Sequence, residues 1–100
     1  MAERKILNNL WTYRKKNGLS QRKVAFLLGH KGSSQLSHYE RGAKLPSLKN
    51  ALRLEIIYHV PVAFLFRELH EGLRMEIRKR GEKAKSKEEN KANNNDPAST

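Results

Sequence analysis

Hydrophobic residues recur at helical spacing in short blocks, and turns that contain glycine or proline separate the blocks. Between Ser20 and Gly42 this pattern predicts two short helices joined by a tight turn. Ser20 can cap the first helix, because its hydroxyl accepts from an early backbone N–H that lacks a partner within the helix. Gly29 suits a left-handed C-terminal cap. The apolar face of this first helix consists of Val24, Ala25, Leu27 and Leu28.

The second helix of this pair is predicted to start with Ser33 or Ser34 as its cap and to end at Gly42. Leu36 and Tyr39 lie three residues apart and therefore share one face. The other face carries hydrogen-bonding side chains and no acid, as expected for a helix that enters the major groove of DNA. These outward residues are Ser33, Ser34, Gln35, Ser37 and His38.

Helices are also predicted on both sides of the pair. The first spans Glu3 to Lys16, with Ile6, Leu7, Leu10 and Trp11 on one side, and Asn17-Gly18 ends it. Ser47 caps a fourth helix that runs to about Tyr58, with its apolar face formed by Leu48, Ala51, Leu52 and Leu54. Pro61 suits the first turn of a fifth helix.

From Arg67 the hydrophobic residues thin to a narrow seam of one in four, formed by Leu65, Leu69, Leu73 and Ile77. This seam packs either on the domain's own core or against a second copy of the chain. After Arg80 the sequence is polar and has no apolar side chain larger than alanine, so residues 81–100 are predicted to be disordered. The predicted organisation is a domain over residues 1–66, a C-terminal helix over 67–80 and a polar tail.

The length of 100 residues allows one small all-α domain. The lack of cysteine excludes disulfides and thiolate metal sites, and it fits a reducing compartment. The charged N-terminus has no hydrophobic signal region. The longest apolar run, Val60 to Phe66, is too short to span a membrane, so no membrane association is expected.

The net charge of +11 is concentrated in the half of the chain that carries the helix pair. From Arg4 to Arg53 there are twelve Lys or Arg residues and a single acid, Glu40. From Leu54 to Ile77 the net charge is −2, and from Arg78 to the end it is +3. Basic residues on many proteins are simply solvated, but this distribution favours a polyanionic partner.

No motif for catalysis, a metal or a cofactor is present. The four histidines are His30, His38, His59 and His70. They form no HExxH pair, and no carboxylate cluster accompanies them. The six glycines form neither a phosphate-binding loop nor a dinucleotide fingerprint. We therefore expect a protein that is not an enzyme and that binds no cofactor.

A series of motifs follows in order between Leu7 and Phe66, and together they resemble one known family. They are Gly18-Leu19-Ser20-Gln21, Val24-Ala25, Leu28-Gly29, Ser37-His38-Tyr39-Glu40-Arg41-Gly42, Leu45-Pro46-Ser47-Leu48 and Val60-Pro61-Val62 with Phe64-Leu65-Phe66. This arrangement is similar to the Cro/C1-type helix-turn-helix family of phage repressors and bacterial regulators, also called the XRE family. The resemblance implies a five-helix, lambda repressor-like fold and a cytoplasmic, bacterial or phage-encoded DNA-binding protein.

The chain departs from the family pattern at three places. The turn around His30-Lys31-Gly32 is one residue longer than in the commonest pattern. Phe26 replaces a polar surface residue, and Glu55 stands where the family usually has a small apolar residue. The sequence gives no account of Glu55.

The resemblance also implies roles for individual residues. Glu40 would pair with Arg14, and an arginine fork suits bidentate pairing with a carboxylate. Gln21 would contact a DNA phosphate, assisted by nearby cations, which are Arg22, Lys31, Arg41 and Lys44. Base contacts would fall to Ser33, Ser34, Gln35 and His38, with Ser37 next to the DNA backbone.

Two functions are compatible with these features. The first is a sequence-specific transcriptional regulator, in particular a repressor, that binds double-stranded DNA as a homodimer through the last helix. The second is a protein-interaction module on the same fold, such as an antitoxin, whose last helix and tail bind a protein partner and whose DNA binding is secondary.

Overall fold

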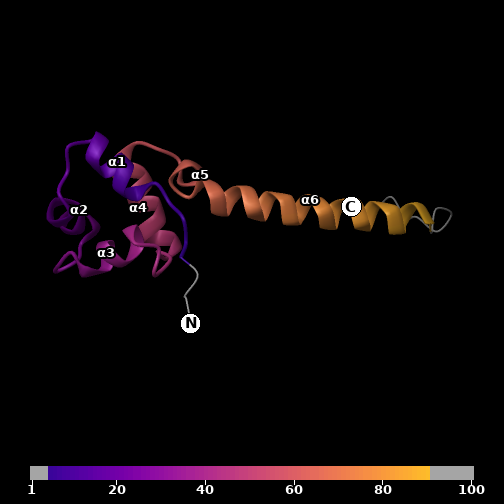
Figure 1. The fold of residues 1–100 in the computed structure, drawn as a ribbon, viewed down its shortest axis with the longest axis horizontal. Coiled ribbons are helices and arrows are strands. Elements are labelled where there is room, and N and C mark those ends of the chain that lie inside the picture. Colours follow the sequence, from indigo (N-terminus) through magenta and orange to yellow (C-terminus); the bar gives the residue numbers. More distant parts are fainter. Residues whose placement is uncertain (1–4, 91–100) are drawn as a thin grey trace. The chain divides into compact units, whose positions relative to one another are not determined.

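The computed structural model describes the backbone of residues 5–90 and the side chains of residues 5–87. Within residues 5–90 the regular secondary structure consists of helices without strands, as predicted (Figure 1). The helices are α1 (Leu10–Lys16), α2 (Gln21–Leu28), α3 (Ser34–Glu40), α4 (Leu48–Tyr58), α5 (Val62–Leu65) and α6 (Arg67–Asn90). The chain divides into an N-terminal unit that ends at His70 and a second unit that begins at Glu71.

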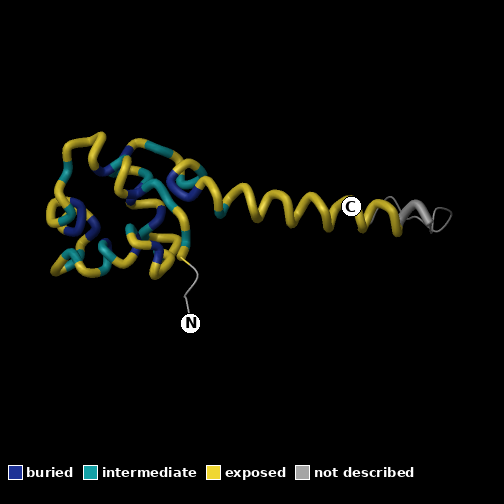
Figure 2. Tube along the Cα trace, in the orientation of Figure 1, coloured by how far each residue is buried: buried dark blue, intermediate teal, exposed yellow. Residues whose placement is uncertain are grey.

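Each of the helices α1 to α5 contributes residues to the core of the N-terminal unit, and Figure 2 colours the buried residues dark blue. Helix α2 packs against α3 and α4, while α1 contacts α3 and α4 contacts α5. The predicted interior residues of the helix pair are buried, with the exception of Leu27. The buried core consists of Leu10, Val24, Leu28, Leu36, Tyr39, Leu54, Tyr58, Leu65 and Phe66.

The ends of α2 and α4 follow from local hydrogen bonds, as predicted. The Ser20 hydroxyl accepts from the Lys23 N–H at 3.0 Å, and the Ser47 hydroxyl accepts from the Asn50 N–H at 3.2 Å. Gly29 ends α2 in the left-handed conformation, with φ 85°. Ser33 stands at the start of α3, although its side chain makes no cap hydrogen bond within the described residues.

The start of the first helix differs from the prediction, because α1 begins at Leu10 rather than Glu3. The residues before it are tied down by hydrogen bonds to distant segments. The Ile6 N–H donates to the Gly42 carbonyl at 2.9 Å, and the Asn8 side chain donates to the Tyr39 carbonyl at 3.0 Å. These contacts replace the helical hydrogen bonds that residues 5–9 would otherwise make. Glu3 itself lies outside the described residues.

Two predicted apolar faces are narrower than expected. On the first helix Leu10 is buried, whereas Leu7 and Trp11 are exposed. On α4 the core takes Ala51, Leu54 and Tyr58, and the exposed apolar residues of that helix are Leu48, Leu52 and Ile56. Hydrophobic spacing predicted these helices correctly but not the part of each that contacts its neighbours.

The predicted fifth helix is two helices, because the backbone at Phe66 leaves the helical region with φ −124° and ψ 54°. Leu65 is buried, and Leu69 packs against the core of the N-terminal unit. The first half of the seam therefore belongs to that core. Leu73 and Ile77 are exposed.

The prediction that the last helix ends near Arg80 is wrong, because α6 continues to Asn90. Residues 81–87 are all exposed, yet Lys, Glu and Ala all favour helices. Ion pairs one turn apart add support, with Glu82 3.8 Å from Arg78 and Glu76 3.7 Å from Arg80. The remainder of the expected disordered tail, residues 91–100, lies outside the described residues.

A cluster of hydrogen bonds around the Arg14 side chain links α1, α2 and α3. Its Nε donates to Glu40 Oε2 at 2.6 Å, and its Nη2 donates to Glu40 Oε1 at 3.2 Å, which gives the predicted bidentate pair. Its Nη1 donates to the Leu19 carbonyl at 3.0 Å, and the Gln21 amide donates to Glu40 Oε1 at 2.9 Å. We call Arg14, Gln21, Glu40 and the Leu19 carbonyl the Arg14 cluster.

The Arg14 cluster is shielded from water. The side chains of Arg14 and Glu40 are only 8% and 4% exposed. Hydrogen bonding of Arg14 to the Glu40 carboxylate raises the pKa of Arg14, so this guanidinium stays charged. Burial, and secondly the negative charge of Glu40, raise the pKa of Tyr58, which keeps its hydroxyl neutral. That hydroxyl is buried and finds no hydrogen-bond partner among the described residues.

Replacing Gly42 should destabilise the N-terminal unit more than replacing Gly18. Both glycines have positive φ, 76° and 67°, so each change to Ala carries a strain of about 1–2 kcal/mol. A Cβ at Gly42 would also lie 2.6 Å from the Ile6 carbonyl oxygen, whereas a Cβ at Gly18 would meet nothing within 4 Å. That contact should add about 1–3 kcal/mol, measurable by urea unfolding. Equal losses for the two variants would contradict the close packing of Ile6 on Gly42.

Removing the charge of Glu40 should be costly, because it leaves the Arg14 guanidinium buried without its counter-ion. We expect Glu40→Gln to lower the free energy of unfolding by about 3 kcal/mol or more. The matched control is Glu71→Gln, which removes the exposed Glu71–Arg74 pair and should cost less than about 1 kcal/mol. Thermal or urea unfolding of both variants measures the difference. If the two variants unfolded alike, the pair would not stabilise this fold.

Candidate nucleic-acid interface

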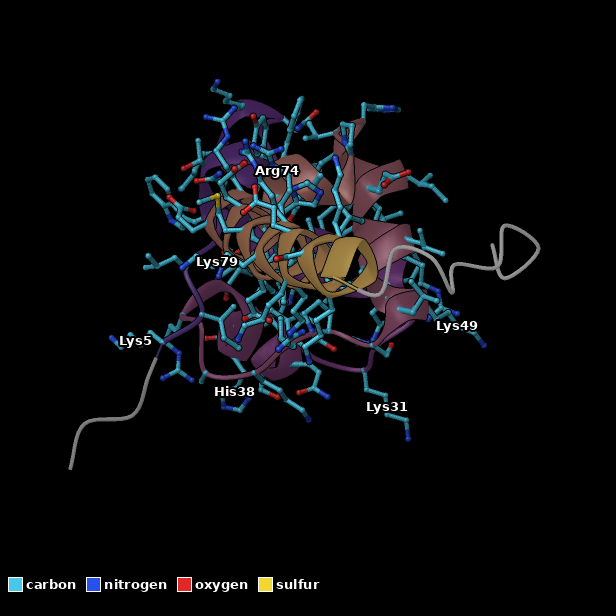
Figure 3. The ribbon with its side chains drawn as sticks, turned by 90° about the vertical axis from the view of Figure 1, so that its right-hand side faces the viewer. Lys5, Lys31, His38, Lys49, Arg74 and Lys79 are labelled. Atoms are coloured by element: carbon cyan, nitrogen blue, oxygen red, sulfur yellow. The ribbon has the colours of Figure 1, made fainter. Side chains whose placement is uncertain are left out.

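Helix α3 has one buried face and one polar face. Leu36 and Tyr39 are in the core, while Ser34 and His38 are exposed and Gln35 is half-buried. These three polar residues fall within about 100° of arc around the helix, because successive residues advance by about that angle. In Figure 3 the His38 side chain points away from the helices. Ser33 and Ser37, both half-buried, flank this arc.

The polar face of α3 has the dimensions and chemistry needed for base contact. An α-helix is about 10–12 Å in diameter with its side chains, which fits a major groove about 12 Å wide. Gln35 can make a bidentate contact to adenine, and the Ser and His side chains can donate or accept. The structure therefore brings Ser34, Gln35 and His38 together on one surface.

The N-terminus of α2 offers a second polar surface. Within the described part of the chain, the backbone N–H groups of Gln21 and Arg22 make no hydrogen bond. Unpaired N–H groups and the helix dipole together favour an anion at this end of a helix. The Gln21 side chain is half-buried because it donates to Glu40, and its amide has a second N–H for an outside acceptor. The geometry suits a phosphate oxygen.

The cations predicted to contact phosphates are all exposed, namely Arg22, Lys31, Arg41 and Lys44. Lys31 points outward on the same side of the view as His38 (Figure 3). Lys44 Nζ lies 3.5 Å from Gln35 Oε1, and Arg41 Nε lies 3.4 Å from the Ser37 carbonyl. Both contacts are at the long limit for a hydrogen bond, so these cations can turn toward a ligand.

A pocket of about 370 Å³ lies between α2 and the turn that leads to α3. Arg22 and Lys31 contribute two positive charges to it, and the exposed Phe26 ring contributes an apolar side. The other lining residues are Ala25, His30, Gly32 and Ser33. His30 Nδ1 is buried and lacks a hydrogen-bond partner within the described residues. This longer turn therefore presents a cationic hollow beside the polar face of α3.

Sequence reasoning missed two features that shape this surface. Phe26 was recognised only as a departure from the family pattern, and His30 was not predicted to lie at the site. The signal that could have revealed them is the longer turn, which places both side chains around one hollow. Glu55 also has an explanation, because its Oε1 accepts from the Val62 N–H at 2.9 Å and so caps α5.

The electrostatics of the interface follow from where the single acid lies. From Lys5 to Arg53 the only carboxylate side chain is Glu40, and it is buried against Arg14. Every charged side chain that this stretch exposes is therefore a cation. A surface of this kind attracts phosphate over the distance allowed by salt screening.

Neither a metal cluster nor a membrane span is found in the part of the chain that the structure describes. No group of three or more His, Asp or Glu side chains there could hold a metal ion. No described helix combines the length and the apolar character needed to cross a membrane.

A family model described as helix-turn-helix matches residues 12–65, which is more than half of the chain. The matched region runs from α1 to the end of α5 and includes the Arg14 cluster and the polar face of α3. No curated protein matches the chain. On the family match, together with the order of its motifs, the chain belongs to the Cro/C1-type, or XRE, family of helix-turn-helix proteins.

Proposed function

We propose that this protein is a sequence-specific transcriptional regulator, and in particular a repressor, that inserts α3 into the major groove of DNA. One observation carries the proposal. The polar face of α3 lies in a region from Lys5 to Arg53 whose only acid is buried, so this face offers hydrogen-bonding groups and every exposed charge around it is a cation. Duplex DNA has the complementary chemistry, with base edges inside a groove bordered by phosphates.

The proposed contacts to DNA are of two kinds, to base edges and to phosphates. Base contacts are made by Ser33, Ser34, Gln35 and His38, with Ser37 next to the DNA backbone. Phosphate contacts are made by the N-terminus of α2, at Gln21 and Arg22, and by Lys31, Arg41 and Lys44. The phosphate contacts set affinity and register, whereas the base contacts set the sequence preference. The protein acts in the cytoplasm, where its cysteine-free chain loses nothing to reducing conditions.

One α3 helix contacts too few base pairs to select a single site in a genome, so the regulator binds as a two-fold dimer. Within α6, Leu73 and Ile77 are 49% and 63% exposed and lie one turn apart. Leu65 and Leu69 are committed to the core of the N-terminal unit. The dimer contact therefore rests on Leu73 and Ile77, and the two α3 helices would lie about 34–36 Å apart on the DNA.

A second function, as a protein-interaction module, is favoured by one observation on α4. Leu48 and Ile56 are 75% and 69% exposed, and with the exposed Leu52 they form an apolar row at intervals of four residues. A row of this kind is the usual contact surface for a partner helix. The double variant Leu52→Lys and Ile56→Lys tests this second function. It would be favoured if the variant lost its biological activity but still bound DNA.

Substitutions on α3 and beside it should separate base contacts from phosphate contacts. Gln35→Ala should cost about 1–3 kcal/mol on the preferred site and relax the preference at one base pair. Lys44→Ala should weaken preferred and random DNA alike and reduce the dependence of log K on log salt by about one. Binding titrations at several salt concentrations measure both effects. Identical behaviour of the two variants would show that α3 does not contact the bases.

Charges placed on the exposed half of the seam should separate the dimer. Leu73→Lys with Ile77→Lys should give folded monomers that keep non-specific binding and lose affinity for the preferred site. The control, Met75→Lys with Ser86→Lys, adds the same charge at exposed positions on the opposite side of α6 and should remain dimeric. Sedimentation measures the state of each variant. A dimer that persisted in the Leu73/Ile77 variant would move the interface to Phe26 and the corner between α4 and α5.

A further inference from the structure

The second unit of the chain carries a basic segment that the helix-turn-helix does not use. From Arg78 to Lys87 there are six Lys or Arg residues and one acid, Glu82. The structure places this segment within α6, and every one of its side chains is exposed (Figure 2). A disordered tail would scatter these charges, whereas a helix fixes their spacing.

Three lysines recur at intervals of four residues within this segment. Lys79, Lys83 and Lys87 therefore lie one above another on the same side of α6, about 6 Å apart along the axis. We call these three residues the lysine row. The Lys79 side chain extends outward from α6 in Figure 3. The two arginines beside the row are occupied, because Arg78 lies near Glu82 and Arg80 lies near Glu76.

The lysine row weakens the helix that carries it. Like charges three or four residues apart destabilise a helix, and neither Lys83 nor Lys87 has an acid at either spacing. Neutral residues such as Gln or Ala would support α6 equally well. A polyanion bound along the row would remove this repulsion and so stabilise α6.

The composition of the segment distinguishes between classes of polyanion. It contains no aromatic residue, so it lacks the stacking surfaces that single-stranded nucleic acids use. Its only apolar residues are Gly81 and Ala84, so it cannot bury a hydrophobic face in a lipid surface. It also has no Asn or Gln for pairing with base edges. What remains is a row of point charges, which suits the phosphate backbone of a DNA duplex.

We propose that the lysine row of α6 is a second DNA-binding element, which contacts the phosphate backbone of duplex DNA without sequence preference. The inference rests on the proposed function, because it supplies a second contact to the same DNA molecule. Two linked contacts bind more tightly than either alone, since the second forms at a high effective concentration. The row thereby raises affinity for duplex DNA of any sequence.

The test replaces the row in the full chain with Lys79→Gln, Lys83→Gln and Lys87→Gln, which keeps a good helix former at each position. The control variant carries Lys5→Gln, Lys15→Gln and Lys16→Gln, three exposed lysines of the N-terminal unit, and so has the same net charge. The probe is a random-sequence duplex of about 40 base pairs, long enough for several phosphate contacts along its length. Circular dichroism checks that α6 persists.

Replacing the row should weaken binding to the random duplex by about tenfold or more near 100 mM salt. The slope of log K against log salt should fall by about 2–3, close to 0.9 for each lost phosphate contact. The control variant should change affinity by less than about twofold, because neither the proposed interface nor the lysine row assigns a phosphate contact to its lysines. Restoring charge with Lys79→Arg, Lys83→Arg and Lys87→Arg should recover the binding.

The other outcomes separate this inference from the proposed function. If the wild-type chain fails to bind duplex DNA, the proposed function fails and the inference fails with it. If the wild type binds and the Gln variant binds equally well, only the inference is overturned. Equal losses in the Gln variant and the control would assign the effect to net charge and overturn it too. A larger loss on single-stranded RNA than on duplex DNA would show that the row binds RNA instead.

Discussion

The buried ion pair between Arg14 and Glu40 is the contact on which the arrangement of the helix pair depends. Burying two charges is costly, and only good geometry and further hydrogen bonds offset that cost. Here the pair is bidentate, and the third guanidinium nitrogen of Arg14, Nη1, donates to the Leu19 carbonyl. The Gln21 side-chain amide donates a further hydrogen bond to Glu40. Because Arg14, Gln21 and Glu40 come from α1, α2 and α3, one cluster fixes the position of α3, the helix that we propose enters the major groove.

The same contact also determines the charge of the surface. Glu40 is the only acid from Lys5 to Arg53, and its partner removes it from the solvent side. An exposed carboxylate near the end of α3 would repel phosphates over roughly a Debye length, about 8 Å at physiological salt. Because Glu40 is buried, the carboxylate that stabilises the fold does not repel DNA phosphates. Stability and DNA attraction are therefore linked through a single side chain.

Local chemistry was predictable from the sequence, and distant contacts were not. The caps at Ser20 and Ser47 depend on neighbours three residues away, so their positions could be predicted. The late start of α1 depends on a hydrogen bond from Asn8 to Tyr39, 31 residues along the chain, which no local pattern reveals. The role of Glu55 likewise required the position of Val62. In the candidate site, the polar residues of α3 followed from spacing, whereas the cationic pocket depended on how the longer turn folds.

In the proposed binding mode the polar face of α3 and the N-terminus of α2 together contact DNA. Nuclear magnetic resonance tests this most directly, by following the backbone amide signals of the full chain as duplex DNA is added. This binding mode should give the largest shifts at Gln21, Arg22 and residues 33–38, with smaller ones along the exposed row of α4. Large shifts confined to residues 48–56, with α3 unchanged, would contradict it.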